Sequence, residues 1–383
     1  MEFELNKEQT QVLDAVRAFS KKELYPQYMK WDREKIFPRH LWKQIGDLGL
    51  IGMNVVAEDG GMGFDYMTLG IAAEEMAKGD VNMAAVTFVE SELFVSMTAQ
   101  GTETVKRKFL YPMLKGDIVS AFAMTEPHCG SDAVAMTTSA TKKGLNYVLN
   151  GEKSGISMNS VADVAVVFAK TDPHAGARGV SAFVVPTDLP GISCQSYDDL
   201  GCRLMVRGSM FLDNVEIPEA YLLGKEGEGF KLGMKSFDAS RVFIALICIG
   251  AARISLEETI SYTKERHAFN RPLAKYEGVS FPVVEHESIL EAVRLLCYKA
   301  LWLRDNGKPH TKEAGMAKWM APKFSVDAIR DCLLLHGHYG YTEDLPLGQR
   351  LRDVIGWEIG DGTSQISKLV VSREIFGREY LPY

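Results

Sequence analysis

The sequence has few cysteines and none of the spacings that make cysteine informative. Its six cysteines in 383 residues are scattered, and no two form a Cys-x-x-Cys pair. We therefore expect reduced thiols in a cytoplasmic protein, with neither a disulfide framework nor a metal site. The six are Cys129, Cys194, Cys202, Cys248, Cys297 and Cys332.

Long apolar runs and an excess of basic charge are also missing. No stretch of about 18 or more uncharged apolar residues occurs, so we expect no membrane span. The first residues, MEFELNKEQTQVL, lack the basic and then apolar layout of a signal peptide. The 50 acidic residues outnumber the 43 basic ones, which gives no support to nucleic-acid binding.

The pattern of apolar and polar residues changes twice along the chain, which divides it into three zones. Residues 1–118 carry apolar side chains at helical spacing and predict an N-terminal helical domain. Residues 119–226 carry short β-rich runs between turn residues, which predict a middle, mostly antiparallel β domain. Residues 227–383 return to long amphipathic patterns, which predict a C-terminal four-helix bundle. The expected fold is α+β, and no internal repeat is present.

Individual elements can be placed within these zones. We expect helices over 8–23, 41–50, 67–78, 230–266, 282–305, 310–335 and 366–375. We expect strands over 147–149, 164–169, 180–185 and 210–215.

The segment from Phe122 to Asp132 reads Phe-Ala-Met-Thr-Glu-Pro-His-Cys-Gly-Ser-Asp. A strand-like start runs into a Gly-Ser-Asp turn, which exposes backbone N–H groups and hydroxyls. Such a turn suits a phosphate or the edge of a flavin. A plain strand-to-loop turn is the alternative, since a short motif alone is a hypothesis.

Three further segments carry candidate chemistry. Asp238 and Arg241 lie three residues apart on one helical face, where a surface salt bridge is the simpler interpretation. Residues 266–272 end a helix in a basic turn. In Gly360-Asp361-Gly362-Thr363-Ser364-Gln365, small residues let a ligand approach the backbone, although Asp361 could simply cap the next helix.

Together, in this order and spacing, the four segments resemble the acyl-CoA dehydrogenase family over nearly the whole chain. The resemblance rests on Thr-Glu-Pro-x-x-Gly-Ser-Asp near residue 130, Phe-Asp-x-x-Arg near 240, Arg-x-x-Phe near 269 and acid-Gly-Thr-Ser-Gln near 361. One such segment is a weak signal, but four of them with the three-zone layout form a specific set.

The resemblance implies an FAD enzyme that removes a proton and a hydride from a coenzyme A thioester. It further implies a homotetramer that passes electrons to electron-transferring flavoprotein. Arg266 and Phe269 are expected to reach FAD across a subunit contact. The residues implied in FAD binding are Phe122, Met124, Thr125, Gly130, Ser131, Ser157, Arg266, Phe269, Gly337, Thr363 and Gln365. Those implied in thioester binding are Glu90, Ser91, Ser131, Asp238, Arg241 and Gly362.

The resemblance makes Asp361 the base that takes the proton next to the thioester carbonyl. The common family residue is Glu, and Asp is one methylene shorter. A displacement of about 1 Å can cost roughly a hundredfold in rate, so either the substrate sits closer or Asp361 is not the main base. Gly360 stands where relatives often have Tyr, and Gly155 where many have Trp. Both changes are expected to widen the space around the acyl group.

Other departures are local. Glu90 and Glu92 lie where relatives line the acyl pocket with neutral residues; we expect both to be solvated or salt-bridged, with a second carboxylate at the substrate as the alternative. Asn270 replaces a frequent Gly. Residues 334–341 replace the usual Gln-x-x-Gly-Gly flavin contact, so only the backbone of Gly337 is carried over there.

The short base and the C-terminal Gly-Arg-Glu-Tyr-Leu-Pro-Tyr383 are similar to the alicyclic branch, the cyclohexane- and cyclohexene-carboxyl-CoA dehydrogenases of anaerobic bacteria. We expect 1,2-elimination on cyclohexane-1-carboxyl-CoA. The alternatives are 1,4-elimination on cyclohex-1-ene-1-carboxyl-CoA, with Glu90 or Glu92 as a further carboxylate, and another short or branched acyl-CoA. A flavin monooxygenase or nitroalkane oxidase of the same fold, and a catalytically silent scaffold, are the competing classes.

Overall fold

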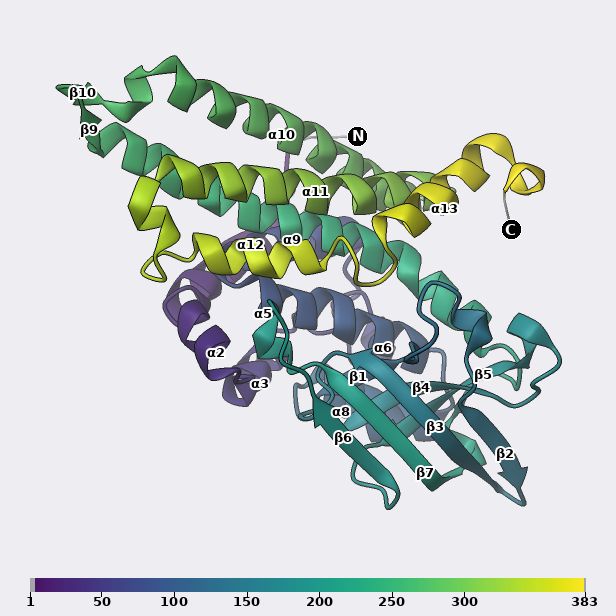
Figure 1. The fold of residues 1–383 in the computed structure, drawn as a ribbon. Coiled ribbons are helices and arrows are strands. Elements are labelled where there is room, and N and C mark those ends of the chain that lie inside the picture. Colours follow the sequence, from purple (N-terminus) through teal and green to yellow (C-terminus); the bar gives the residue numbers. More distant parts are fainter. Residues whose placement is uncertain (1–3, 382–383) are drawn as a thin grey trace.

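The computed structural model describes residues 4–381, so Pro382 and Tyr383 of the C-terminal resemblance lie outside the described residues. The order of helices, sheet and helices along the chain confirms the expected α+β fold. In Figure 1 the long green and yellow helices form the upper layer, and the teal sheet lies below them. The purple and blue N-terminal helices lie on the same side of the bundle as the sheet.

The N-terminal part is helical, as predicted, but its helices are short. They are α1 (Lys7–Phe19), α2 (Tyr28–Glu34), α3 (Arg39–Asp47), α4 (Tyr66–Gly79), α5 (Val81–Ala85), α6 (Ser91–Thr98), α7 (Glu103–Val105) and α8 (Tyr111–Leu114). One turn of π-helix, Val86–Glu90, joins α5 to α6. Every residue from Val81 to Val95 is buried, so this segment runs through the interior.

The middle part is one mostly antiparallel sheet in the order β6-β7-β3-β2-β4-β5-β8, with β1 paired to β4 in parallel. The strands are β1 (Ser120–Ala123), β2 (Ser139–Lys143), β3 (Asn146–Ile156), β4 (Val164–Lys170), β5 (Val180–Pro186), β6 (Ile192–Ser196), β7 (Gly208–Pro218) and β8 (Leu222–Leu223). β4 and β5 are buried on both faces, which explains their continuous apolar sequences.

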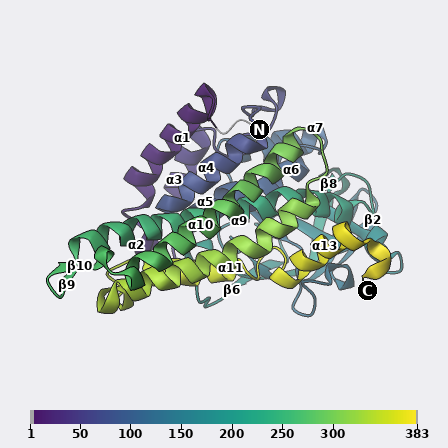
Figure 2. The ribbon, with the colours of Figure 1, turned by 90° about the horizontal axis from the view of Figure 1, so that it is seen from above.

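The C-terminal part is built around α9 (Gly229–Glu265), which packs against α4, α10 and α11. The others are α10 (Glu277–Asp305), α11 (Thr311–Leu335), α12 (Leu347–Gly356) and α13 (Ser364–Phe376), with a small hairpin of β9 (His267–Ala268) and β10 (Arg271–Pro272). Figure 2 shows α9, α10 and α11 side by side from above. The expected helix over 282–305 begins earlier, at Glu277, with Pro282 inside it.

Two glycines of α9 let backbones approach closely. A Cβ atom at Gly229 would lie 2.4 Å from backbone atoms of β5, and one at Gly250 would lie 2.3 Å from the Glu74 carbonyl oxygen of α4. α9 is also long and apolar enough to cross a membrane, with a mean hydropathy of 1.7 in its most apolar window. Since 83% of that window is buried inside the protein, it is a core helix.

Candidate active site

Asp361 lies in the loop between α12 and α13. In Figure 1 this loop is on the side of the bundle that faces the sheet. The φ of 54° at Asp361 places this residue in the left-handed region, which is uncommon for a residue with a side chain. Among residues 4–381 its buried Oδ2 atom has no hydrogen-bond partner. The side chain of Thr363, not of Asp361, caps α13 by accepting from the N–H of Ile366 at 3.2 Å, so the capping alternative for Asp361 is wrong.

Lys318, on α11, holds this loop by hydrogen bonds. Its side chain is fully buried, and Nζ donates to the carbonyl oxygens of Trp357 at 2.7 Å and Gly362 at 3.1 Å. These two carbonyls flank Asp361. Burial lowers the pKa of Lys318 to about 8, against the opposing effect of the Asp361 charge. An ammonium group therefore both fastens the loop and lies near the candidate base.

Glu90 lies at the end of the π-helical turn and is 7% exposed. Burial, and then the charge of Asp361, raises the pKa of Glu90 to about 8, although Ser157 and Arg207 favour its charged form. The two carboxyl groups therefore interact, although they come from opposite ends of the sequence. The expectation that Glu90 is solvated or salt-bridged is wrong, because the residue is buried and forms no ion pair with any residue from 4 to 381.

The two carboxyl groups have different surroundings. Burial raises the pKa of Asp361 as well, but Lys318, Arg241 and Arg207 all favour its ionised form. Of these cations only Arg207 acts on Glu90. When the environments of two acids differ in this way, their pKa values differ, and one can act as a base while the other keeps its proton. Asp361 therefore loses its proton more readily than Glu90.

Glu92 is buried too, so the expectation of solvation or a salt bridge is also wrong for this residue. Its Oε1 atom accepts from Asn54 Nδ2 at 2.9 Å, and no ion pair reaches it within the described chain. Burial raises the pKa of Glu92 to about 7, against the effects of Asn54 and Arg304. The charge of Asp361 does not act on Glu92, which separates it from the carboxyl pair.

Two of the residues expected to bind the thioester form hydrogen bonds within the protein. The Ser91 hydroxyl is buried and donates to the carbonyl oxygen of Thr87, within its own helical segment. Arg241 does pair with Asp238, at 2.6 Å. The surface interpretation of this pair is wrong, because 11% of the Arg241 side chain and 21% of the Asp238 side chain are exposed. The second oxygen of Asp238 accepts from the Thr311 hydroxyl at 2.8 Å.

Gly155 and Gly360 differ in what surrounds them. A Cβ atom at Gly360 would meet only Gly356 and the Trp357 ring, at 3.5 Å, so a side chain there is not excluded. Gly155 has a φ of 67°, which itself favours glycine. A Cβ atom at Gly155 would lie 3.3 Å from Nη2 of Arg207. The space beside Gly155 is therefore taken by a guanidinium group, not left open as the sequence suggested.

The turn after β1 is held by a buried ion pair. Lys153 Nζ donates to Glu126 at 2.8 Å and to the Met124 carbonyl at 3.0 Å. Burial opposes the charge of Glu126, but Lys153 and the Thr137 and Thr138 donors outweigh it and lower the pKa of Glu126 to about 2. Glu126, His128 and Cys129 offer ligand atoms within 4.8 Å of one another, but both oxygens of Glu126 already accept hydrogen bonds from Lys153, Thr137 and Thr138. Thr125, Gly130 and Ser131 remain exposed beyond this anchor.

The remaining FAD-binding candidates fall into two groups. Near the turn, Phe122 packs edge-on to Phe237 with a ring separation of 5.6 Å. Arg266, Phe269 and Gly337 lie at the far end of the bundle, where Tyr262 on α9 stacks on His336 at 4.3 Å. Phe269 is 92% exposed at the tip of the β9–β10 hairpin, at the upper left of Figure 1. One chain therefore does not bring the two groups together.

The loop around Asp361 offers polar atoms to a ligand. Besides Asp361 Oδ2, the buried Nε1 of Trp357 and Oγ of Ser364 have no hydrogen-bond partner among the described residues. Thr363 and the exposed Gln365 follow directly. Buried polar groups are normally satisfied, so three orphaned ones in eight residues mark a place for a polar ligand. The donor set fits a flavin and a thioester lying against this loop.

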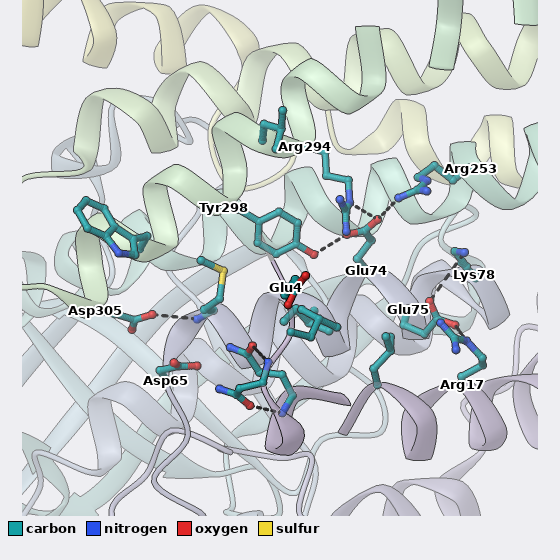
Figure 3. Close-up of a pocket in the computed structure, with 18 of the residues that line it drawn as sticks. Glu4, Arg17, Asp65, Glu74, Glu75, Lys78, Arg253, Arg294, Tyr298 and Asp305 are labelled. Atoms are coloured by element: carbon teal, nitrogen blue, oxygen red, sulfur yellow. Dashed lines mark hydrogen bonds and ion pairs between the residues drawn. The ribbon is translucent and has the colours of Figure 1, made fainter. Parts of the chain in front are cut away.

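A separate cavity of about 510 Å³ lies between α1, α4, α9 and α10 (Figure 3). Glu74 stands at its wall and accepts from Arg253, Arg294 and Tyr298 at 2.6–2.9 Å. These charged groups satisfy one another. None of the residues predicted from the sequence to bind FAD or thioester lines this cavity, so it is not the candidate site.

Sequence reasoning missed two residues of the site. Lys318 stands in Ala-Gly-Met-Ala-Lys-Trp-Met-Ala, and a lone lysine in an apolar helical stretch was a usable signal. Arg207 carried no such signal, because only the folded chain brings the start of β7 to Glu90 and Asp361.

Three comparisons bear on this geometry. The chain matches the description "Acyl-CoA dehydrogenase" in its N-terminal domain over residues 6–117, its middle domain over 121–215 and its C-terminal domain over 227–376. The short-chain specific acyl-CoA dehydrogenase of Clostridium acetobutylicum is 35% identical, covering 98% of this chain and all of that protein. Butyryl-CoA dehydrogenase from Megasphaera elsdenii has a similar structure, with a TM-score of 0.94 and 32% identity over 98% of this chain and all of that one.

A second structure, described as the electron transferring flavoprotein of Acidaminococcus fermentans, matches with a TM-score of 0.95 and 35% identity, again over 98% of this chain and all of that one. The matched domains cover nearly the whole chain in the expected order. The chain belongs to the acyl-CoA dehydrogenase family.

Proposed function

We propose that this protein dehydrogenates cyclohexane-1-carboxyl-CoA to cyclohex-1-ene-1-carboxyl-CoA, with Asp361 as the base. Membership of the family makes it an FAD-dependent oxidoreductase that acts on acyl-CoA thioesters. The observation that carries the finer proposal is the unpartnered Oδ2 of Asp361, a short carboxylate on a loop with no side chain at Gly360.

The residues divide the chemistry as follows. The Asp361 carboxylate accepts the proton from the carbon next to the thioester carbonyl. The backbone N–H of Asp361 would hold the developing enolate oxygen. FAD, when bound, supplies the acceptor for the hydride that leaves the next carbon. Arg241 and Asp238 hold the coenzyme A portion, which keeps the reacting carbons against Asp361.

A compact ring suits this base better than a long chain. Asp is one methylene shorter than Glu, so the carbon that loses its proton must lie close to the backbone. The absence of a side chain at Gly360 leaves room for the width of a ring there. Burial raises the pKa of Asp361, which makes it a stronger base than an exposed carboxylate, while Lys318 and Arg241 favour its ionised form.

Glu90 favours a second candidate, 1,4-elimination on cyclohex-1-ene-1-carboxyl-CoA to the 1,5-diene. Its carboxyl group could take a proton from a ring carbon further from the thioester. We place this candidate second because burial raises the pKa of Glu90 to about 8, so it holds its proton near neutral pH. A short linear or branched acyl group is the third candidate, in keeping with the names of the relatives.

The FAD-binding role of the remaining residues is part of the same proposal. The turn residues Phe122, Met124, Thr125, Gly130 and Ser131 would contact the flavin with Ser157, and Thr363 and Gln365 would contact it from the bundle. Arg266, Phe269 and the backbone of Gly337 would serve the FAD of a neighbouring subunit. The 92% exposure of Phe269, far from its own turn residues, supports this division.

Assembly and partners follow from that division. We infer a homotetramer, supported by the exposed Phe269 and by Phe281 and Val284 on the outer face of α10. We infer electron-transferring flavoprotein as the electron acceptor, in keeping with the description of the Acidaminococcus structure. A cytoplasmic location is part of the proposal, supported by bacterial relatives such as the Clostridium acetobutylicum protein.

Anaerobic reduction of the bound flavin by a panel of thioesters tests the proposal. Cyclohexane-1-carboxyl-CoA should bleach it fastest, ahead of cyclohex-1-ene-1-carboxyl-CoA, butyryl-CoA and isovaleryl-CoA. If butyryl-CoA bleaches the flavin fastest, the preferred substrate carries a short linear acyl chain and not a ring. A flavin that no thioester bleaches would favour a monooxygenase, a nitroalkane oxidase or a silent scaffold.

A further inference from the structure

Asp353 lies on α12, eight residues before Asp361, and its side chain is fully buried. Its Oδ2 atom accepts from the Tyr28 hydroxyl at 2.7 Å and from Nδ2 of Asn82 at 3.0 Å. Its Oδ1 atom accepts from the N–H of Cys202 at 2.6 Å. Three neutral donors from three distant parts of the chain therefore meet on one carboxyl group.

Asn82 begins the segment that carries Glu90. The Asp80 carboxylate caps α5 by accepting from the N–H groups of Asn82 at 2.8 Å and Met83 at 3.1 Å. The backbone of Asn82 is thus fixed as well as its amide. From there the chain runs without a break through α5 and the π-helical turn to Glu90. A shift of Asn82 is therefore passed along one continuous helical segment to Glu90.

The third donor belongs to the turn before β7, which packs directly on α12. A Cβ atom at Gly201 would lie 2.2 Å from the carbonyl oxygen of Arg352, so the two backbones are in contact. Further along this turn, the carbonyl oxygen of Met205 accepts from the N–H of Met158 at 2.7 Å. Met158 directly follows Ser157, a residue proposed to contact the flavin. The position of α12 therefore fixes the segment at Ser157 through this turn.

The same helix leads into the loop of the candidate base. α12 ends at Gly356, and the N–H of Gly360 donates to the Gly356 carbonyl oxygen at 2.9 Å. The loop thus continues from α12 as a closed turn, and Lys318 holds it from α11. A displacement of α12 at Asp353 is therefore passed to Asp361.

We propose that Asp353 is a positioning residue, which holds the candidate base Asp361 in place relative to the segments that carry Glu90 and Ser157. The inference rests on the proposed function, because it takes Asp361 as the base. Asp353 acts through the backbone and needs no contact with substrate or cofactor. A misplacement of about 1 Å can cost roughly a hundredfold in rate, so a support shared by three segments of the site affects catalysis.

The support needs a carboxylate, because both oxygens accept hydrogen bonds. An Asn side chain has one acceptor oxygen, and its NH2 group only donates. In Asp353→Asn the NH2 group must face either the N–H of Cys202 or the donors of Tyr28 and Asn82. One side of the junction then loses its acceptor, and the buried donors there are left unsatisfied. The variant therefore loosens the junction while it keeps nearly the same volume.

The test compares wild type with Asp353→Asn, Asn82→Ala and Tyr28→Phe in the FAD-loaded protein, at a temperature where circular dichroism shows them folded. With cyclohexane-1-carboxyl-CoA, Asp353→Asn and Asn82→Ala should lower kcat by at least about tenfold, with KM within about twofold of wild type. Asn82→Ala alone decides the question if Asp353→Asn does not fold.

Tyr28→Phe is the matched control. It removes a hydrogen bond to the same Oδ2 atom, but Tyr28 lies on α2, which carries none of the candidate site residues. Its kcat should therefore stay within about twofold of wild type, even if the protein unfolds at a lower temperature. Equal losses of kcat in Tyr28→Phe and Asn82→Ala, or a wild-type kcat in Asn82→Ala, would overturn the proposal.

Amide hydrogen exchange adds a readout that needs neither substrate nor base. Asp353→Asn should speed exchange in three peptides that lie far apart in the sequence, 83–92, 202–207 and 354–363, whereas Tyr28→Phe should leave them as in wild type. Unchanged exchange in these peptides would count against the role of Asp353. An Asp361→Asn protein that still reduces its flavin at the wild-type rate would count instead against the proposed base, so the two failures are distinguishable.

Discussion

The buried ammonium group of Lys318 donates a 2.7 Å hydrogen bond to the carbonyl oxygen of Trp357, four residues before Asp361. Its second bond, to Gly362, closes the other side of the same loop. The left-handed backbone of Asp361 is thus held between two carbonyls that share one donor. A conformation that an aspartate rarely adopts persists because a residue of another helix stabilises it.

Lys318→Met should destabilise the protein and slow flavin reduction. The change removes the ammonium group that donates to two loop carbonyls. Each buried carbonyl left without a donor costs about 1–3 kcal/mol. Thermal unfolding and stopped-flow reduction measure the two effects. Lys323→Met is the matched control, because Lys323 lies on the same helix with a half-exposed side chain and pairs with Asp327. Equal losses in both variants would contradict the special role of Lys318.

Asp361→Asn should abolish proton removal without loss of shape. The amide keeps the loop and the backbone N–H groups, so FAD and thioester should still bind. Flavin reduction should fall by at least about a hundredfold, the low end for a positioned general base. Asp361→Glu should slow the cyclic substrate, because the longer side chain overreaches a ring held near the backbone.

Glu90→Gln distinguishes the two elimination patterns. If Asp361 is the base and Glu90 is a protonated neighbour, the variant should reduce at close to the wild-type rate with cyclohexane-1-carboxyl-CoA. Loss of reduction with cyclohex-1-ene-1-carboxyl-CoA alone would assign the 1,4-elimination to Glu90. If Asp361→Asn still reduces the flavin and Glu90→Gln does not, the base is Glu90, in the helical turn at 86–90.

Arg241→Ala should raise the KM for the thioester far more than it lowers kcat, since a contact with coenzyme A acts in both ground and transition states. Arg241 also favours the ionised form of Asp361, so the comparison belongs at high pH, where that carboxyl is charged in both proteins. An unchanged KM there would leave the Asp238–Arg241 pair as a structural ion pair only.

Glu92→Gln should stabilise the protein increasingly as pH rises. Burial raises the pKa of Glu92 from 4.5 to about 7 in the folded chain, so its ionisation lowers the free energy of unfolding as pH rises through that interval. Removing the group should recover up to about 3 kcal/mol at alkaline pH and nothing below the ordinary carboxyl pKa. Urea unfolding at several pH values measures the difference from wild type. Glu285→Gln, on the exposed face of α10, should show no such trend.

The sequence was most informative where a pattern is local. Helical spacing located α9 to within one residue at each end, and the family motifs named Asp361, Asp238 and Arg241 as residues of one site. The strand-like start at Phe122 indicated β1, but β2 and β6 were not predicted, because strands of five residues show too little alternation to detect. Burial of Glu90 and Glu92 was missed because a charged side chain in sequence gives no sign of what will cover it.

The π-helical turn at Val86–Glu90 has a consequence for how the protein can change over evolutionary time. Its hydrogen bond from the Ser91 N–H to the Val86 carbonyl accommodates one residue more than an α-helical turn would. Each residue rotates a helix by about 100°, so α6 is out of phase with α5 by that amount. Deletion of a single codon here would restore a continuous helix and turn a different set of α6 side chains inward. A change in length here would therefore reorient all of α6 at once, which no scan of point substitutions would sample.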